Sequence, residues 1–294
     1  MHPPVMYDYV NAYNGTLSPS TLHCTDVGLT RFFQKYLLQK AMSVFKWELP
    51  QNWDKDFFLY GLYCFGHMAV INTDKFGVIP QFCGLSGYNV FYKPSNAVIS
   101  NPLLKGFLTP TIDEQCTVFK LNADYSGIWD IVAYYADLMA ISAQTAGINM
   151  VNSKLSYVFF AKDKSSAESY KKMMDKILSG EPIAVVDKHL YSENGSKAWE
   201  MFSQNLKNNY LVSDILADMQ KYENMFCTAV GLPNANTEKR ERMIVDEVNA
   251  NNIETDSNAE MWLERLQITA AKTRELFNVN VFVDWRNKPE ERAV

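Results

Sequence analysis

The sequence predicts an α+β fold, and three observations support that class. Two long amphipathic helical patterns, near residues 128–147 and 205–230, flank a short module of mixed strand and helix character. The stretch from Met68 to Val118 consists instead of short apolar runs interrupted by glycine, proline and charged residues, which is typical of strands and loops. A chain of 294 residues with 47% hydrophobic content can also bury a sizeable core in one or two domains.

Two helices are expected before the β-rich stretch. The first runs from Asp26 to Glu48, where apolar residues recur every three or four positions, and Thr25 or Asp26 is its expected N-cap. Leu49–Pro50 ends it, because a residue before proline avoids the helical conformation. A shorter helix is expected over Asp54 to Cys64.

The glycines at the start of the β-rich stretch are interpreted as turn residues. They do not have the spacing of a phosphate-binding loop, which must stand directly before a helix. These glycines are Gly66, Gly77, Gly84 and Gly87.

The middle of the chain predicts a helix, a compact α/β insertion and a second long helix. Ser126 is the expected cap of the first helix, from Ile128 to about Gly147, which carries small residues along one side. The insertion is expected to contain a strand, a lysine-rich helix and another strand, and the second long helix follows it. The expected ranges are Tyr157–Phe160, Ser165–Ser179, Ile183–Val186 and Asn205–Val230.

A long polar stretch from Gly231 to Ser257 separates that helix from the last one. It has few large apolar residues and carries charges of both signs, so we interpret it as a functional loop or an ordinary solvated one. After it, Glu260–Phe277 predicts a helix and Val279–Trp285 predicts a strand, and the charged tail from Arg286 is expected to fray.

This polar stretch carries a resemblance to a known family. Asn234–Asn236, followed by Glu238–Met243 and Asp246–Val248, is similar to the upper-collar protein of small short-tailed bacteriophages, which is their portal or head–tail connector. The likeness continues at Asn278–Val281 and at Phe45–Glu48. It implies a subunit with long stem helices, a small α/β clip and a wing that is discontinuous in sequence. The implied divisions are residues 1–127 as the N-terminal portion of the wing, 128–151 as a stem helix, 152–204 as the clip, 205–231 as a second stem helix, 232–258 as the tunnel loop and 259–294 as the C-terminal portion of the wing.

The resemblance also implies a function. Family members form a homododecameric ring at one capsid vertex, which is the channel for genome packaging, retention and ejection and the attachment point for motor and tail. On that basis the expected DNA-contacting residues of the tunnel loop are Lys239, Arg240 and Arg242. The acidic neighbours expected to keep the attraction weak are Glu238, Glu241, Asp246 and Glu247. Candidates for motor or tail docking in the clip are Lys162, Lys164, Lys171 and Lys172.

The partners implied by the resemblance are further copies of the chain, double-stranded genomic DNA, a packaging ATPase, lower-collar or tail proteins, and capsid and scaffold proteins. A packaging RNA is left open, because the first basic residue is Arg31 and the N-terminus therefore lacks the basic arm found in related portals. The expected location is the head–tail vertex of the virion, after assembly in the host cytoplasm. Residues 1–20 do not have the charged and apolar pattern of a signal peptide, and no apolar stretch has the length of a membrane span, so we expect neither element.

The search for catalytic motifs predicts a protein that is not an enzyme and needs no cofactor or metal. No nucleotide-binding G-x-x-x-x-G-K-[ST] loop, H-E-x-x-H motif or G-x-S-x-G elbow occurs, and the five cysteines have no C-x-x-C spacing. The four histidines stand far apart in sequence and are expected to be surface or core residues. A net charge of -5 argues against an independent protein that grips nucleic acid tightly.

Two alternative functions stay open from sequence. One is another adaptor or lower-collar ring of the same virion. The other is a metal-dependent nucleic-acid-processing enzyme such as a nuclease, in which Asp113–Glu114 or Asp246–Glu247 would hold a divalent ion with help from another segment.

Overall fold

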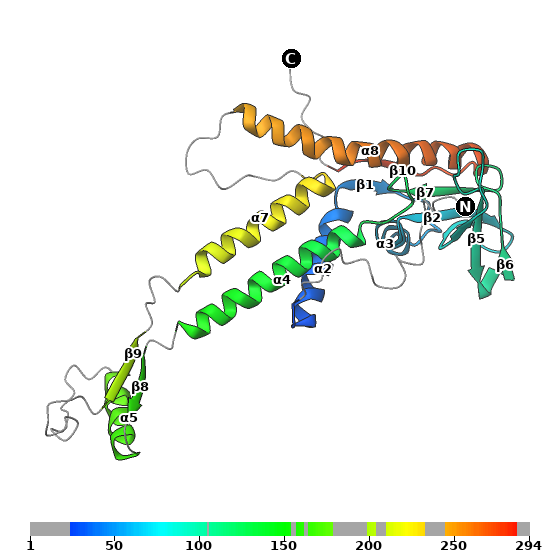
Figure 1. Ribbon diagram of the computed structural model, residues 1–294. Coiled ribbons are helices and arrows are strands. Elements are labelled where there is room, and N and C mark those ends of the chain that lie inside the picture. Colours follow the sequence, from blue (N-terminus) through cyan, green and yellow to red (C-terminus); the bar gives the residue numbers. More distant parts are fainter. Residues whose placement is uncertain are drawn as a thin grey trace, which may run out of the picture. The chain divides into compact units, whose positions relative to one another are not determined.

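The computed structural model describes residues 24–104, 106–153, 157–161, 164–178, 199–203, 210–232 and 245–286 (Figure 1). These residues form two compact units. The first unit contains the described residues up to Ile141 and from Asp218 onward, and the second contains those from Ser142 to Ala217.

The first unit begins with helix α2 (Val27–Met42) and strand β1 (Phe45–Glu48). The side chain of Asp26 caps α2 by accepting a hydrogen bond from the backbone N–H of Leu29 at 3.1 Å, as expected. The helix does not continue to Glu48, so that portion of the prediction is wrong. Within the strand Phe45 and Trp47 are buried while Lys46 and Glu48 are exposed, and this period of two belongs to a strand.

Helix α3 (Lys55–Phe65) confirms the second predicted helix. Asp54 caps its start, and Gly66 ends it with a φ of 87°. A Cβ atom at Gly66 would lie 2.0 Å from the backbone carbon of Ser126, so the end of α3 lies directly against the chain that enters the next long helix. The backbone N–H of Ile128 donates to the carbonyl of Tyr63 at 2.9 Å and fixes the same contact.

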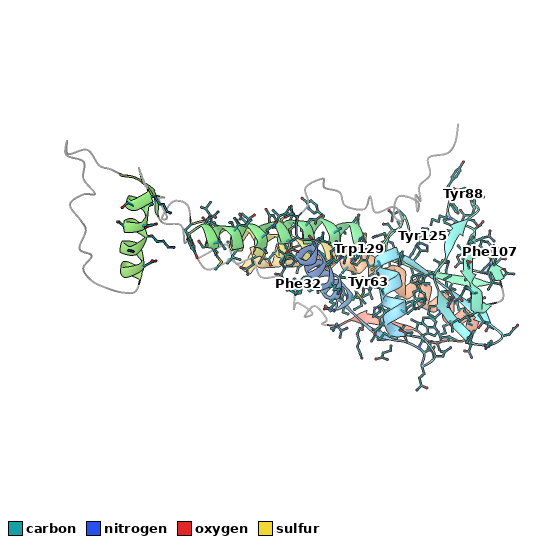
Figure 2. The ribbon with its side chains drawn as sticks, turned by 90° about the horizontal axis from the view of Figure 1, so that it is seen from below. Phe32, Tyr63, Tyr88, Phe107, Tyr125 and Trp129 are labelled. Carbon is teal, nitrogen blue, oxygen red and sulfur yellow. The ribbon has the colours of Figure 1, made fainter. Side chains whose placement is uncertain are left out.

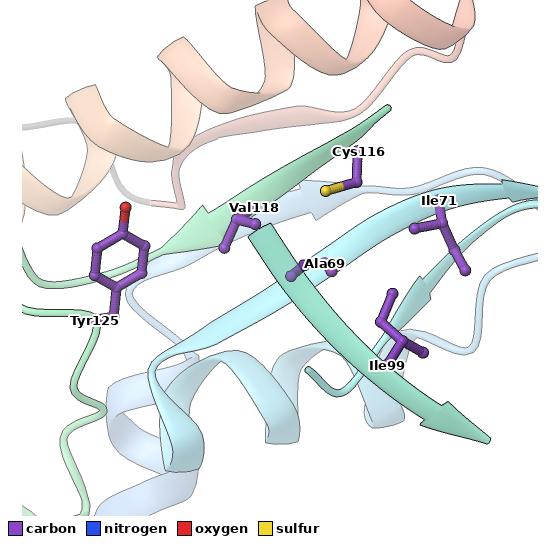
Figure 3. Packing of buried hydrophobic residues seen from close by; sticks show 7 residues of the cluster. Ala69, Ile71, Ile99, Cys116, Val118 and Tyr125 are labelled. Carbon is purple, nitrogen blue, oxygen red and sulfur yellow. The ribbon is translucent and has the colours of Figure 1, made fainter. Parts of the chain in front are cut away.

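Two small antiparallel sheets form the β-rich region. The first has the strand order β3 (Gly77–Gln81), β2 (His67–Thr73) and β7 (Cys116–Lys120). The second has the order β4 (Gly84–Ser86), β5 (Asn96–Asn101) and β6 (Gly106–Leu108), with a 3₁₀ turn, η1 (Pro102–Leu104), between the last two. Their apolar side chains share one cluster, made of Ala69, Ile71, Ala97, Ile99, Cys116, Val118 and Tyr125 (Figure 3).

The expected turn glycines are confirmed with one exception. Gly66, Gly77 and Gly87 have positive φ angles, which glycine adopts without the clash that a Cβ atom would cause. Gly84 lies instead within β4, where it is paired with Val98 of β5.

Helix α4 (Trp129–Asn152) is longer than the pattern predicted. Ser126 is not its cap, because its hydroxyl donates to the carboxylate of Asp124 at 2.7 Å and the helix starts three residues later. Within the first unit its side chains Ala136, Met139 and Ala140 are almost fully buried. This side of the helix therefore packs into the first unit, while the close approach of another helix stays a prediction.

The second unit contains a strand pair and a helix. Strand β8 (Tyr157–Ala161) and helix α5 (Lys164–Leu178) confirm the predictions for this region. Strand β8 pairs antiparallel with β9 (Trp199–Ser203), which the sequence pattern did not indicate. The predicted strand Ile183–Val186 lies outside the described residues. Helix α7 (Val212–Val230) starts later than the expected Asn205, although residues 204–209 lie outside the described ranges.

Helix α8 (Val245–Phe277) and strand β10 (Phe282–Trp285) complete the first unit. The helix begins at Val245 instead of Glu260, so the second half of the polar stretch is helical and not a loop. Strand β10 pairs antiparallel with β1, with Phe45 opposite Trp285 and Trp47 opposite Val283. The first and last segments of the unit therefore meet in one two-stranded sheet.

Candidate functional site

The predicted DNA-contacting residues Lys239, Arg240 and Arg242 lie outside the described residues, as do Glu238 and Glu241. Asp246 and Glu247 fall in the first turn of α8. The structure therefore describes the candidate site through the two elements that hold its ends, which we call its anchors. The first anchor is the end of α7, and the second is formed by the later turns of α8.

The first anchor is the C-terminus of α7. Gly231 has a φ of 77° and donates its N–H to the carbonyl of Thr228 at 3.3 Å, while Leu232 donates to that of Cys227 at 2.8 Å. These two bonds form a Schellman motif, which satisfies the carbonyl groups that a helix end otherwise leaves unpaired. Phe226 and Val230 in the last turns are fully buried. The helix thus ends at a fixed point, Val230, two residues before the end of the described segment at Leu232.

A polar cluster ties α7 to α2. The carboxylate of Glu223 accepts a hydrogen bond of 2.6 Å from the hydroxyl of Tyr36 and forms an ion pair with the ammonium group of Lys40. Lys40 also lies 3.7 Å from the sulfur of Cys227. Sequence reasoning missed this cluster, because Tyr36 and Lys40 show only helical spacing and their partner lies on a distant helix.

The pKa values in this cluster follow from partial burial and mutual contact. Burial alone would lower the pKa of Lys40, but its hydrogen bond to Glu223 and the neighbouring charge raise it to about 12. Burial alone would raise the pKa of Glu223, yet the hydrogen bonds from Lys40 and Tyr36 hold it below its ordinary value. Both groups are therefore charged near neutral pH, and the ion pair between α2 and α7 is complete.

The second anchor joins α8 to the loop after β7. The indole N–H of Trp262 donates to the side-chain oxygen of Asn122 at 3.0 Å, and the guanidinium of Arg265 donates to the carbonyl of Leu121 at 3.1 Å. Leu266, one position further on, is fully buried. This face of α8 is therefore fixed by directional bonds as well as by apolar packing.

A buried hydroxyl pair continues the second anchor. The hydroxyl oxygens of Thr117 on β7 and Thr273 on α8 lie 2.7 Å apart, and Thr273 also donates to the carbonyl of Thr269 at 2.8 Å. Thr117 and Thr273 are almost completely buried. The stretch between Leu232 and the packed turns of α8 is thus fixed at both ends within the first unit.

The alternative metal site finds no support among the described residues. Asp113 forms an ion pair of 2.7 Å with Lys272, and no group of three or more His, Cys, Asp or Glu side chains in the described ranges is placed to hold a metal ion. His67 is a core residue, as expected: each ring nitrogen lies 3.0 Å from a carbonyl oxygen, and burial lowers its pKa.

Lys120 is a half-buried cation with other cations near it. Lys120 lies over the ring of Tyr125, with its ammonium nitrogen 4.0 Å from the ring centre. Burial lowers the pKa of Lys120 to about 8, and repulsion from Lys93, Arg265 and Lys272 adds to the effect.

Three of the four clip candidates have a described position. Lys164, Lys171 and Lys172 lie exposed on α5, and Lys162 lies outside the described residues. None of the helices that the structure describes is both long and apolar enough to cross a bilayer.

Comparison with solved structures finds a likeness to a chain in the structure titled "Portal and tail of native bacteriophage P68". The two chains share 14% sequence identity, the match covers 90% of each, and the TM-score is 0.48. A family model described as "Phage Connector (GP10)" matches residues 25–289. Because that match spans nearly the whole chain, the protein belongs to the phage connector family.

Proposed function

We propose that the protein assembles into a closed homododecameric ring at one capsid vertex, and that the phage genome passes through the channel of this ring during packaging and ejection. The observation that carries the proposal is the connector-family match over residues 25–289. As a head–tail connector the protein is a structural component of the virion and not an enzyme, so the nuclease alternative is not retained.

The segments of the subunit take the following roles in the proposal. Residues 128–151 and 205–231 are the stem helices, 152–204 the clip and 232–258 the tunnel-loop segment, whose second half is the start of α8, while 1–127 and 259–294 form the wing. The clip and wing dock the packaging ATPase, the tail proteins, and the capsid and scaffold. A packaging RNA stays open as a further partner.

The charge pattern of the tunnel loop suits DNA that must slide. Lys239, Arg240 and Arg242 offer transient contacts to backbone phosphates, and Glu238 and Glu241 beside them reduce the net attraction. At physiological salt, exposed charges act over only about 8 Å, so each contact is short-lived as the DNA moves. Weak contacts repeated around a ring retain DNA collectively without stopping its translocation.

The two anchors support the same role. A loop that contacts moving DNA transmits force to its attachment points, and here one end follows a capped helix while the other leads into a helix bonded to β7 and its loop. Force on the tunnel loop is therefore expected to pass into packed and hydrogen-bonded parts of the first unit.

Charge reversal in assembling phage tests the DNA-contact role. We expect Lys239→Glu with Arg240→Glu to leave ring and head formation intact but to lower the number of stably filled heads, because repulsion replaces attraction at the DNA phosphates. The matched control reverses two exposed basic residues of α2, Arg31→Glu with Lys35→Glu, and so changes the net charge equally. The readout is DNA protected from nuclease per assembled head.

The outcome of these experiments distinguishes a DNA-contacting loop from a structural one. Equal numbers of filled heads in the loop variant and the wild type would contradict DNA contact by Lys239 and Arg240. Deleting residues 236–244, which stops before the first residue of α8, tests the segment as a whole. Loss of ring assembly in that deletion would make the segment a structural strut instead.

A further inference from the structure

One side of helix α3 is apolar and exposed. After Asp56 the helix contains no charged residue, although only one side of it packs into the core, through residues such as Phe58 and Leu62. The other side carries a chain of aromatic rings in edge-to-face contact, extended by Phe82 next to β4. We call this surface the aromatic face; it consists of Phe57, Tyr60, Phe65 and Phe82, with ring centres 4.7 to 6.2 Å apart.

This composition is that of a helix buried on all sides. Yet Tyr60, Phe65 and Phe82 are 49%, 39% and 42% exposed in a single subunit. Contiguous exposed aromatic side chains of this kind mark a site of association, since isolated surface aromatics do not form such a chain of contacts.

A second exposed apolar surface is the loop of residues 87–95 between β4 and β5. We call it the aromatic loop. Its side chains Tyr88, Val90, Phe91 and Tyr92 are between 58% and 86% exposed. Figure 2 shows Tyr88 projecting away from the strands, while Tyr63 marks the separate position of α3.

The aromatic loop is ordered by its own hydrogen bonds. The side-chain oxygen of Asn89 accepts bonds from the N–H groups of Phe91 and Lys93 at 2.9 and 3.1 Å. The N–H of Asn89 donates to the carbonyl of Lys93 at 2.9 Å, and Tyr92 adopts a positive φ of 57°. A loop already held in one conformation loses little entropy when it binds, which favours association.

The two surfaces are complementary in charge. Lys93 is the only charged residue of the aromatic loop, and its side chain is exposed. Asp56 lies one helical turn before Tyr60, at the edge of the aromatic face. Within the described residues neither Lys93 nor Asp56 forms an ion pair.

We propose that the aromatic loop of one subunit docks onto the aromatic face of the next subunit, with Lys93 of the first paired to Asp56 of the second. This inference rests on the proposed ring. Two different surfaces of the same chain then form a head-to-tail contact, which is the kind that generates a closed ring of identical subunits. The contact buries both aromatic surfaces and neutralises one isolated cation and one isolated anion.

Charge exchange tests the pairing directly. Lys93→Glu and Asp56→Lys each place like charges opposite one another, so each is expected to weaken subunit association about fivefold or more and to lower the fraction of protein in rings. The double variant restores the pair with exchanged signs, and the ring fraction is expected to return towards the wild-type value. Ring fraction is measured by sedimentation of the full chain at several salt concentrations.

Controls separate docking from folding. Lys93 is exposed, so Lys93→Glu is expected to keep the wild-type unfolding temperature. Asp56→Lys replaces the acidic residue in the first turn of α3 and is expected to lower that temperature slightly, because its interaction with the helix dipole is lost. Phe91→Ser is expected to lower the ring fraction, whereas Phe76→Ser, at an exposed aromatic on the turn between β2 and β3, is expected to leave it unchanged. Equal effects of these two serine variants, or failure of the charge exchange to restore rings, would overturn the proposal.

A photo-crosslinking amino acid at position 91 identifies the contacted surface. In assembled rings we expect a crosslinked dimer joined to the peptide that contains residues 55–65 or to Phe82 of a second copy. Three other results would overturn the docking while rings remain visible by microscopy. They are a crosslink to residues 1–23 of the same copy, a crosslink to another surface of a second copy, and a crosslink found only in heads and only to a capsid or tail protein. Absence of rings would instead refute the proposed function and the docking together.

Discussion

The hydroxyl pair between Thr117 and Thr273 gives the sharpest prediction about the second anchor. Thr273 has one hydroxyl proton, and that proton is donated to the carbonyl of Thr269 at 2.8 Å. The proton in the 2.7 Å contact must therefore come from Thr117, which makes Thr273 the acceptor. The two threonines are 1% and 0% exposed, so water cannot replace either partner.

The assignment predicts unequal effects for substitutions of equal size. Thr273→Val leaves the Thr117 hydroxyl buried without an acceptor and is expected to cost about 1–3 kcal/mol of unfolding free energy. Thr117→Val removes only the donated bond, because Thr273 keeps its bond to Thr269, and is expected to cost about 0.5–1.5 kcal/mol. Replacing both residues leaves no unsatisfied hydroxyl, so the double variant is expected to be more stable than Thr273→Val alone.

Urea unfolding at fixed protein concentration measures this cycle. The variants are compared by their urea midpoints of unfolding. This comparison requires that the slope of the unfolding free energy against urea concentration is the same in each variant. The reasoning about the proton is refuted if Thr117→Val costs more than Thr273→Val. It is also refuted if the cost of the double variant equals the sum of the two single costs.

Two further predictions concern the glycine turns and the polar cluster. Gly66→Ala is expected to be much more destabilising than Gly77→Ala, although both glycines have a positive φ. A Cβ atom at Gly66 would lie 2.0 Å from a backbone atom, whereas the atom nearest to a Cβ at Gly77 is 4.0 Å away. Thermal unfolding of the two variants checks this, and equal losses of stability would contradict it. Glu223 has a lowered pKa, so its stabilising effect is present above the unfolded-state pKa and is lost as pH falls through the folded-state value. Between pH 7 and pH 3 the wild type is therefore expected to lose more stability than Glu223→Gln, and parallel curves would contradict the assignment.

The sequence predicted the helices whose ends are set by residues close to them in the chain. Asp26 and Asp54 cap α2 and α3 through contacts three residues away, so the start of each helix follows from the local sequence. The β-rich stretch likewise follows from its glycines and prolines. Strand β1 could not be predicted, because the pairing of Phe45–Glu48 with β10 depends on residues at the far end of the chain.

The early start of α8 has a different cause. Residues 245–257 have the polar composition of a loop, but they precede a helix whose later turns are packed and bonded. Extending an existing helix costs far less than starting one, so a polar sequence can continue it. The candidate DNA contacts at Lys239, Arg240 and Arg242 came from resemblance alone and stay a prediction, because they lie outside the described residues.

Electron microscopy of the purified protein, with averages viewed down the particle axis, tests the central claim most directly. The proposed ring predicts closed particles with an open central channel, and their averages give the subunit number as the first result. Monodisperse single subunits at every salt concentration, with no ring, would contradict it.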